Sequence, residues 1–124
     1  MPAINPQYLA HKCIEENTVI AQEDIKWAIA VDMSGNIVTT PGAYVYGFAT
    51  SDEVTGDPVC LETKGECIGI CGTPFTKETD LAIDAAGKLA PAAAGDQIVG
   101  RALEDVTTVD LYTIIQKTEE GTKA

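Results

Sequence analysis

The chain has 124 residues, of which 45% are hydrophobic, and its 19 acidic against 8 basic residues give a formal net charge of −11. This length suits one domain, and the scattered Lys and Arg residues argue against binding nucleic acid through phosphates. No apolar stretch approaches the roughly 20 residues of a membrane-spanning helix. We therefore expect a single globular domain, made in a cytosol, with neither a nucleic-acid nor a membrane partner.

Residues 1–18 are expected to form an N-terminal arm. Pro2 and Pro6 remove backbone donors and disfavour helix just before them. An exposed segment that is nonetheless rich in apolar side chains usually has a docking site. We predict an extended arm that adds to a sheet edge of another protein or a sister subunit; the alternatives are a short helix over residues 6–17 and a frayed terminus. The candidate contact residues are Ile4, Tyr8, Leu9 and Ile14.

Strand and turn signals dominate the remaining chain. Trp27, Ile29 and Val31 alternate with alanines, which predicts a strand that places Trp27 in the core. Asp32 followed by Gly35 is typical of a hairpin turn. We predict further strands over residues 45–50, 59–63, 66–71, 97–103 and 111–116, and a mobile polar tail over 118–124.

The chain contains an internal sequence repeat. Residues 45–64 align without a gap with residues 98–117, and residues 29–40 align with residues 81–92. The identical pairs of the longer match are Gly47/Gly100, Ala49/Ala102, Asp52/Asp105, Thr55/Thr108, Asp57/Asp110 and Lys64/Lys117. The alternative to a duplication is that two unrelated hairpins share turn residues.

These patterns predict an all-β fold, a small β-barrel or β-tulip-like domain built from two tandem repeats that each contain a hairpin. One copy is too short to bury a core alone, so the two must pack together. We divide the single domain 1–124 into the arm (1–18), a first half (19–71), a second half (72–117) and the tail (118–124). The matching Gly47 and Gly100 indicate a bulge or a close approach of backbones.

The four cysteines allow more than one interpretation. Cys60, Cys67 and Cys71 lack the two close ligand pairs of a structural zinc site. Cys67 and Cys71 fall on one face of a strand, which favours buried free thiols without a metal. A disulfide and a metal site around Cys60, Cys67 and Cys71 are the alternatives, and manufacture in a cytosol weighs against the disulfide.

Catalytic patterns are weak. His11, the single histidine, falls on the same side as Cys13 if the segment is a strand, but no oxyanion-hole loop accompanies them. Carboxylates are so numerous that any pairing for acid–base catalysis is uninformative. We expect a protein that is not an enzyme and that carries no cofactor.

Several phrases resemble a known family. The runs Asp84-Ala85-Ala86-Gly87-Lys88, Ala94-Gly95-Asp96 and Val99-Gly100-Arg101-Ala102-Leu103-Glu104 are similar to those of the head-decoration, or capsid cement, proteins of tailed bacteriophages. A Gly-Asp or Gly-Glu normally follows in that family. The first half has Gly56-Asp57, but the second has Val109-Asp110, so the glycine is absent there.

The resemblance implies a structural virion protein on the outer surface of an assembled capsid. Such a protein binds the major capsid protein, commonly as a homotrimer, and stabilises contacts between capsid subunits. A different class is a small carbohydrate- or metal-binding module, which would use exposed aromatic side chains or the cysteine region. Exposure of Trp27 on a concave surface would favour the carbohydrate alternative.

Overall fold

The computed structural model describes residues 11–118 and 121–124, and over these residues the chain forms strands and no helix. The strands are β1 (Cys13–Ile20), β2 (Ala30–Val31), β3 (Gly47–Ala49), β4 (Pro58–Ile70), β5 (Asp80–Ile83), β6 (Leu89–Pro91), β7 (Gly100–Ala102) and β8 (Tyr112–Lys117). The all-β class is therefore confirmed. Nothing in the described ranges is a helix long and apolar enough to cross a membrane.

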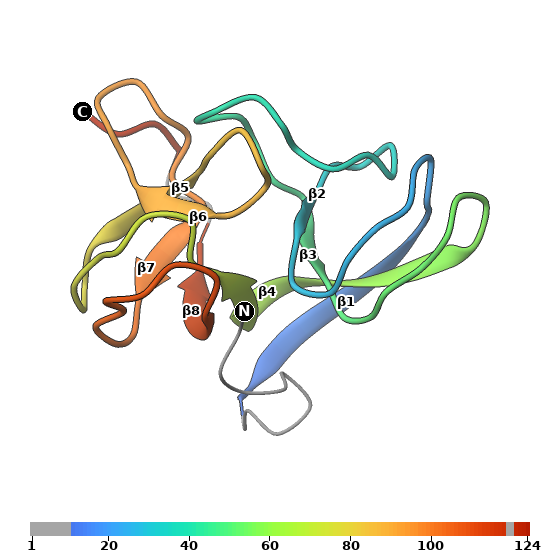
Figure 1. Cartoon of the computed structure of the whole chain (residues 1–124), viewed down its shortest axis with the longest axis horizontal. Coiled ribbons are helices and arrows are strands. Elements are labelled where there is room, and N and C mark those ends of the chain that lie inside the picture. Colours follow the sequence, from blue (N-terminus) through green and yellow to red (C-terminus); the bar gives the residue numbers. More distant parts are fainter. Residues whose placement is uncertain (1–10, 119–120) are drawn as a thin grey trace.

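All the strands belong to one curled sheet whose strand pairs are antiparallel. Its order is β2-β3-β4-β8-β7-β5-β6, with β1 paired to β4 beside this path. The first part of β4 pairs with β1 and β3, and its last part pairs with β8. Figure 1 shows β1–β3 and β5–β8 on opposite sides of the molecule, with β4 running from one group to the other. The fold is a small, barrel-like β domain.

β4 replaces two strands of the sequence prediction. Residues 59–63 and 66–71 were expected to form separate strands, but the strand continues through Gly65. Gly65 has φ of 84° and pairs with both Cys13 and Lys117. A Cβ at this position would lie 2.7 Å from the backbone nitrogen of Ile14. The glycine therefore marks a close approach of β1 to β4 and not a strand end.

β1 begins inside the segment assigned to the arm. Residues 13–18 pair with β4 of the same chain, so a helix over 6–17 is wrong for the described part of that range. The physical reason is that backbone groups along one edge of β1 pair with residues 58–65 of β4, whereas a helix there would leave those groups of β4 unpaired on that side. Ile4, Tyr8 and Leu9 lie outside the described residues, and docking of the arm stays a prediction.

The two halves contain equivalent irregularities. Ala28 and Glu78 both have left-handed backbone conformations, with φ of 65° and 72°. The Ala28 backbone nitrogen donates to the Ala49 carbonyl, and the Glu78 nitrogen donates to that of Ala102, both at 2.8 Å. A residue other than glycine rarely adopts the left-handed conformation. Its occurrence in both halves, each time with a hydrogen bond to the matching alanine of the next strand, supports the duplication, which itself stays a prediction.

The matched glycines of the two halves also sit in equivalent contacts. A Cβ on Gly47 would lie 2.7 Å from the carbonyl oxygen of Glu62 in β4, and one on Gly100 would lie 2.5 Å from that of Gln116 in β8. The expected close approach of backbones is therefore confirmed. A side chain at either position would push the neighbouring strand away.

The second hairpin is two residues longer than the first. In the first half Val31 pairs with both Gly47 and Ile37. In the second half two residues take these two pairings: Leu81 pairs with Gly100 on the next strand, and Ile83 pairs with Leu89 across the hairpin. Aligning residues 29–40 with 81–92 is therefore right for the turn but two residues out of step for the pairing with the next strand.

Residues 121–123 are attached to the second half, which differs at these described positions from the mobile tail expected over 118–124. Gln97 and Thr122 form an antiparallel bridge, and the Lys123 backbone both donates to Asp96 and accepts from Gly95. Lys123 Nζ also lies 3.0 Å from an Asp80 carboxylate oxygen. Backbone pairing holds residues 121–123, although none of these three residues belongs to a buried apolar cluster.

The core is shared between the halves. The largest buried cluster combines Phe48 and Val45 of the first half with Leu81, Leu89 and other residues of the second. A second cluster lies within the first half around Val59 and Leu61. The third cluster, on the opposite face of β4, contains Ala28, Ile29, Ile68 and Ile70, with Tyr112 and Ile114 packed against it.

Candidate binding site

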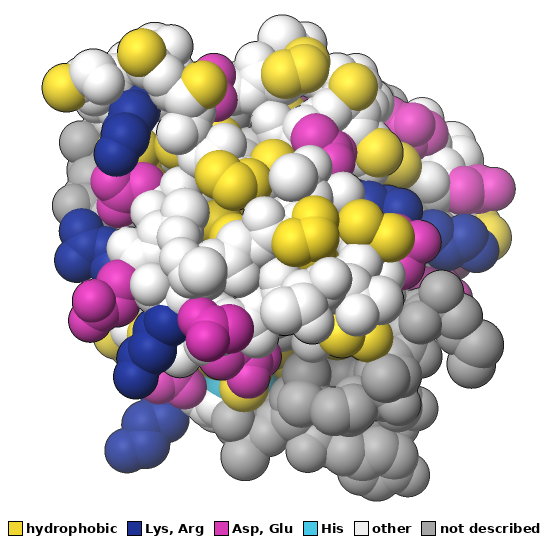
Figure 2. Space-filling model, turned by 60° about the vertical axis from the view of Figure 1, so that its left-hand side comes forward, with side chains coloured by type: hydrophobic (Ala, Val, Ile, Leu, Met, Phe, Trp, Pro, Cys, Tyr) yellow, Lys and Arg dark blue, Asp and Glu magenta, His cyan; other side chains and the backbone are white. Residues whose placement is uncertain are grey.

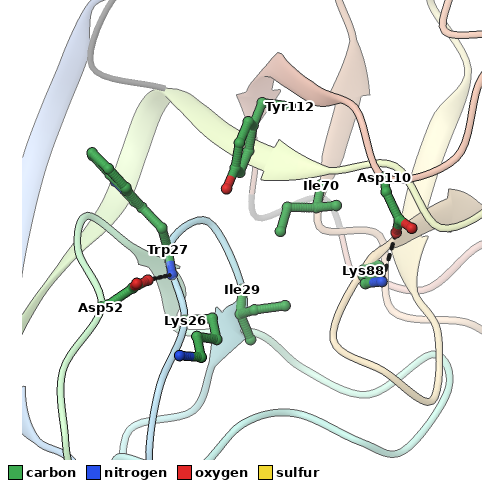
Figure 3. Close-up of a pocket in the computed structure, with 8 residues that line it drawn as sticks. All are labelled: Lys26, Trp27, Ile29, Asp52, Ile70, Lys88, Asp110 and Tyr112. Carbon is green, nitrogen blue, oxygen red and sulfur yellow. Dashed lines mark hydrogen bonds and ion pairs between the residues drawn. The ribbon is translucent and has the colours of Figure 1, made fainter. Parts of the chain in front are cut away.

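A hollow of about 350 Å³ opens where the two halves meet over the third cluster. This volume is at the lower end of the range for small-ligand sites. Both halves contribute to its lining, and Figure 3 shows their side chains around one space. The lining residues are Lys26, Trp27, Ile29, Asp52, Ile70, Lys88, Asp110 and Tyr112. We call this hollow the interlobe groove.

Trp27 lies at the groove and not in the core, which corrects the sequence prediction. Ala28 adopts φ of 65°, so the alternation expected from Trp27 to Val31 is broken. Ala28 and Ala30 take the fully buried positions, while Trp27 is half-buried. The Trp27 backbone nitrogen donates to Asp52 Oδ1 at 2.8 Å, which fixes the loop that carries the indole.

The floor of the groove is apolar. Ile29, which precedes β2, and Ile70, which ends β4, both belong to the third cluster. Tyr112 begins β8, and Figure 3 shows its hydroxyl pointing toward the space between Trp27 and Ile29. Partial burial, followed by the nearby charge of Asp52, raises the pKa of Tyr112. Its hydroxyl therefore stays a neutral donor and acceptor at neutral pH.

An ion pair closes the other end. Lys88 Nζ lies 2.6 Å from Asp110 Oδ1. The hydrogen bond from Lys88, and then its charge, lower the pKa of Asp110. The Lys88 backbone nitrogen donates to Asp84 Oδ1 at 3.0 Å, so the turn between β5 and β6 places this side chain. Asp110 has φ of 66°, a left-handed conformation that Asp tolerates better than most residues.

The groove carries groups that suit the binding of a ligand. An indole and a phenol stand beside an aliphatic floor, with carboxylates and ammonium groups at the ends. Aromatic groups with a polar tip suit partly wet ligands such as a sugar ring or an extended peptide. Asp110 is held ionised by Lys88, which makes it a poor general acid.

The cysteines occupy three environments and are all unpaired. Cys67 and Cys71 are buried in the main core, on the face of β4 opposite Ile68 and Ile70, as predicted. Burial raises the pKa of both thiols. Within residues 11–118 and 121–124, Cys60, Cys67 and Cys71 do not form a ligand group; the group that could hold an ion contains Cys13 instead.

His11 and Cys13 do not form a nucleophilic pair. His11 Nε2 lies 2.5 Å from Glu62 Oε2, whereas the Cys13 thiol donates to the Glu15 carbonyl. Burial, and then the charge of Glu62, raise the pKa of Cys13, the reverse of what an activated thiolate requires. Ile14, a predicted contact residue, is 76% exposed on β1 and does not line the interlobe groove.

Sequence reasoning missed most of the groove. One available signal was the alignment of the halves, in which Tyr112 stands opposite Val59, so that a polar-tipped aromatic replaces a buried aliphatic side chain. The second was Asp110, where the expected preceding glycine is absent. Lys88 carried no signal beyond its place in a turn.

No family model and no curated protein matches the chain. Among solved structures, the N base of head fiber gp8.5 in bacteriophage phi29 is similar, with a TM-score of 0.68 and 14% sequence identity. The match covers 89% of this chain and 98% of that one. The two proteins therefore share a fold over nearly their whole lengths.

Proposed function

We propose that the chain is a structural, non-enzymatic protein of a bacteriophage head that binds the outer surface of the assembled capsid and stabilises contacts between major-capsid subunits. The observation that carries the proposal is the shared fold with a phage head fiber base over 89% of the chain. The resemblance of residues 84–104 to head-decoration proteins points to the same setting from the sequence alone.

The surface suits a protein displayed in many copies. The net charge is −11, and strong like charge keeps displayed copies from aggregating. On the face in Figure 2, basic side chains are interspersed with acidic ones and do not gather into one large patch. Lys64 and Arg101, for example, lie 3.8 Å and 3.5 Å from carboxylates. This arrangement supports a protein partner over a nucleic acid.

The sheet edges support self-association. β2 and β6 end the path of the sheet, and each is only two or three residues long. Short edges avoid indiscriminate pairing, yet they leave room for a sister subunit at a defined place. We propose a homotrimer at local three-fold positions of the shell, with the N-terminal arm as a further contact.

Head particles that lack the protein provide the test. Purified protein is added, the particles are sedimented, and bound copies are imaged. We expect density at regular three-fold sites on the outer surface. Failure to bind intact particles would contradict the function, and isolated single copies away from any three-fold would contradict the trimer.

A matched pair of variants locates the contact. Ile14 is 76% exposed and Met33, at the first hairpin turn, is 64% exposed. We expect Ile14→Lys to weaken particle binding and Met33→Lys to leave it unchanged. Equal binding by both variants would show that β1 is not part of the contact surface.

The interlobe groove favours a second candidate, a carbohydrate-binding module. Trp27 and Tyr112 line one concave surface, the observation that would favour this class. Trp27 is the single Trp of the chain, so its fluorescence reports on the groove directly. Titration with neutral oligosaccharides should change that fluorescence if the candidate is right, with Tyr112→Ala weakening the response and the exposed Tyr44→Ala leaving it intact. No saturable response would reject it.

A further inference from the structure

Three side chains with metal-ligating atoms converge where β1 begins to pair with β4. The thiol of Cys13 and one carboxylate oxygen each from Glu16 and Glu62 all lie within 4.8 Å of one another. This group is separate from the interlobe groove, with which it shares no lining residue. A thiol and two carboxylates are chemically a mixed ligand set and not a surface cluster of acids.

The backbone at this place is irregular in a way that builds the group. Cys13 and Glu16 are three residues apart, so in a regular strand their side chains would point to opposite faces. The register between β1 and β4 shifts between Cys13 and Glu15 and again between Glu15 and Glu16. Such shifts re-aim side chains, and here they turn Cys13 and Glu16 toward the same side. Glu16 then stands directly opposite Glu62.

Glu62 is held in place as a ligand would be. Its side chain is 7% exposed, and the residue sits in the middle of β4. His11 Nε2 lies 2.5 Å from Oε2, and the Ile68 backbone nitrogen donates to Oε1 at 3.2 Å. A carboxylate has about four lone-pair positions, so both oxygens keep one for a further partner. Hydrogen bonds of this kind orient the ligands of metal sites.

The electrostatics call for a cation. Like charges directly opposite on antiparallel strands destabilise a sheet, and Glu16 and Glu62 form such a pair. The sulfur of Cys13 lies against the same two carboxylates. A divalent ion between the three side chains would replace the repulsion between the two carboxylates by attraction to the ion.

We propose that Cys13, Glu16 and Glu62 bind one zinc ion, with His11 as a positioning residue that holds Glu62. Zinc is the borderline ion that accepts sulfur, nitrogen and carboxylate ligands together in a tetrahedron, whereas calcium and magnesium prefer oxygen ligands alone. The ion would fasten the start of β1 to β4. This inference replaces the sequence-based expectation that the cysteines carry no metal, and it does not depend on the proposed capsid role.

The test uses the full chain, reduced and freed of metal, titrated with zinc chloride in a calorimeter. We expect one ion per chain, and a higher unfolding temperature in the presence of zinc. Cobalt(II) in place of zinc should give a thiolate-to-metal charge-transfer band, because Cys13 is a ligand. The band tests the identity of the sulfur ligand independently of affinity.

Variants separate this site from general binding of ions to an acidic surface. Cys13→Ser should abolish the cobalt band, and Cys13→Ser and Glu16→Gln should each weaken zinc binding by more than about 100-fold, since loss of an outer partner alone costs about 10–100-fold. His11→Ala should fall within that smaller range. Glu15→Gln is the control, because it removes the same charge from the next residue of β1.

Two results would overturn the proposal. One is zinc binding that is weak, involves many ions per chain and is unchanged by Cys13→Ser. The other is an equal loss of affinity in Glu15→Gln and Glu16→Gln, which would show that net charge and not geometry attracts the ion. Cys13 and Glu16 are not buried, so these variants should fold, and their unfolding temperatures without zinc check that they do.

Discussion

Substitution of Gly65 by Ala tests how β1 is attached to β4. Gly65 has φ of 84°, a left-handed conformation that L side chains adopt at a cost. The added Cβ would lie 2.7 Å from both the backbone nitrogen and Cγ1 of Ile14, and 2.9 Å from the Lys12 carbonyl oxygen. Two of these atoms are backbone, so relief requires the start of β1 to move away from β4.

The expected cost has two parts. The left-handed conformation costs about 1–2 kcal/mol for a residue with a Cβ. Moving the start of β1 removes the hydrogen bond from the Glu66 backbone nitrogen to the Lys12 carbonyl, at 2.9 Å, which is worth about 0.5–1.5 kcal/mol. We therefore expect Gly65→Ala to lower the free energy of unfolding by roughly 1.5–3.5 kcal/mol.

Gly56→Ala separates the two parts. Gly56 has φ of 93°, but a Cβ there would meet no atom within 4 Å. This control carries the conformational cost alone, about 1–2 kcal/mol. Urea unfolding of the three proteins at neutral pH gives the comparison, with stability read from the midpoint at constant slope. Equal destabilisation by the two substitutions would refute the close packing of β1 against Gly65.

Three further predictions follow from the core, the groove and the arm. Cys67→Ser should lower the free energy of unfolding by on the order of 1–3 kcal/mol in urea, because the hydroxyl would be fully buried and too far from the Glu62 and Gly65 carbonyls, which the longer thiol reaches at 3.6 and 3.7 Å, to be well satisfied. A change under about 0.5 kcal/mol would contradict this. Lys88 lowers the pKa of Asp110 in the folded state, so the pair stabilises above the ordinary Asp value of about 3.9 and loses its effect as pH falls through the lowered pKa. Lys88→Met should therefore destabilise at pH 7 but not in strong acid, and an equal effect at both would argue against the ion pair. Deleting residues 2–9 should leave a folded protein that binds head particles more weakly, as measured by co-sedimentation, and unchanged binding would exclude the arm from the contact.

Turn chemistry explains why the fold class could be predicted. Asp32 and Asp84 each accept hydrogen bonds from backbone nitrogens two and four residues later. Both hairpin turns could therefore be predicted from residues that are close together in the sequence. Alternation along β4 also separated Cys67 and Cys71 from the isoleucines between them. Such signals work because they are set by neighbours in the chain.

Long-range pairing explains what was missed. Gly65 suggested a break because local rules treat a glycine within a strand as a weakness, yet β1 and β8 together keep β4 continuous. Ala28 broke the pattern around Trp27 because its backbone nitrogen reaches Ala49 on another strand. These outcomes depend on which strands meet, and a single sequence does not contain that information locally.

The candidate sites show the same limit more strongly. The interlobe groove takes its lining from five separate segments between residues 26 and 112, and its aromatic pair, Trp27 and Tyr112, is far apart in the chain. Cys13 looked isolated in the sequence, and only the register of β1 against β4 brings it to Glu62. In both cases the residue types were visible beforehand but their juxtaposition was not.

The course of β4 also bears on how such a molecule could act on a shell. One strand supplies the sheet of both halves, and the main cluster combines Phe48 from one half with Leu81 and Ile115 from the other. The halves therefore have no hinge of their own, since moving one would break both the sheet and the core. A body of this kind holds the β1 edge and the short edges at β2 and β6 at fixed distances from one another. A fixed spacing is what a protein needs if it is to join neighbouring subunits of a regular lattice, because compliance between its contact surfaces would weaken the connection.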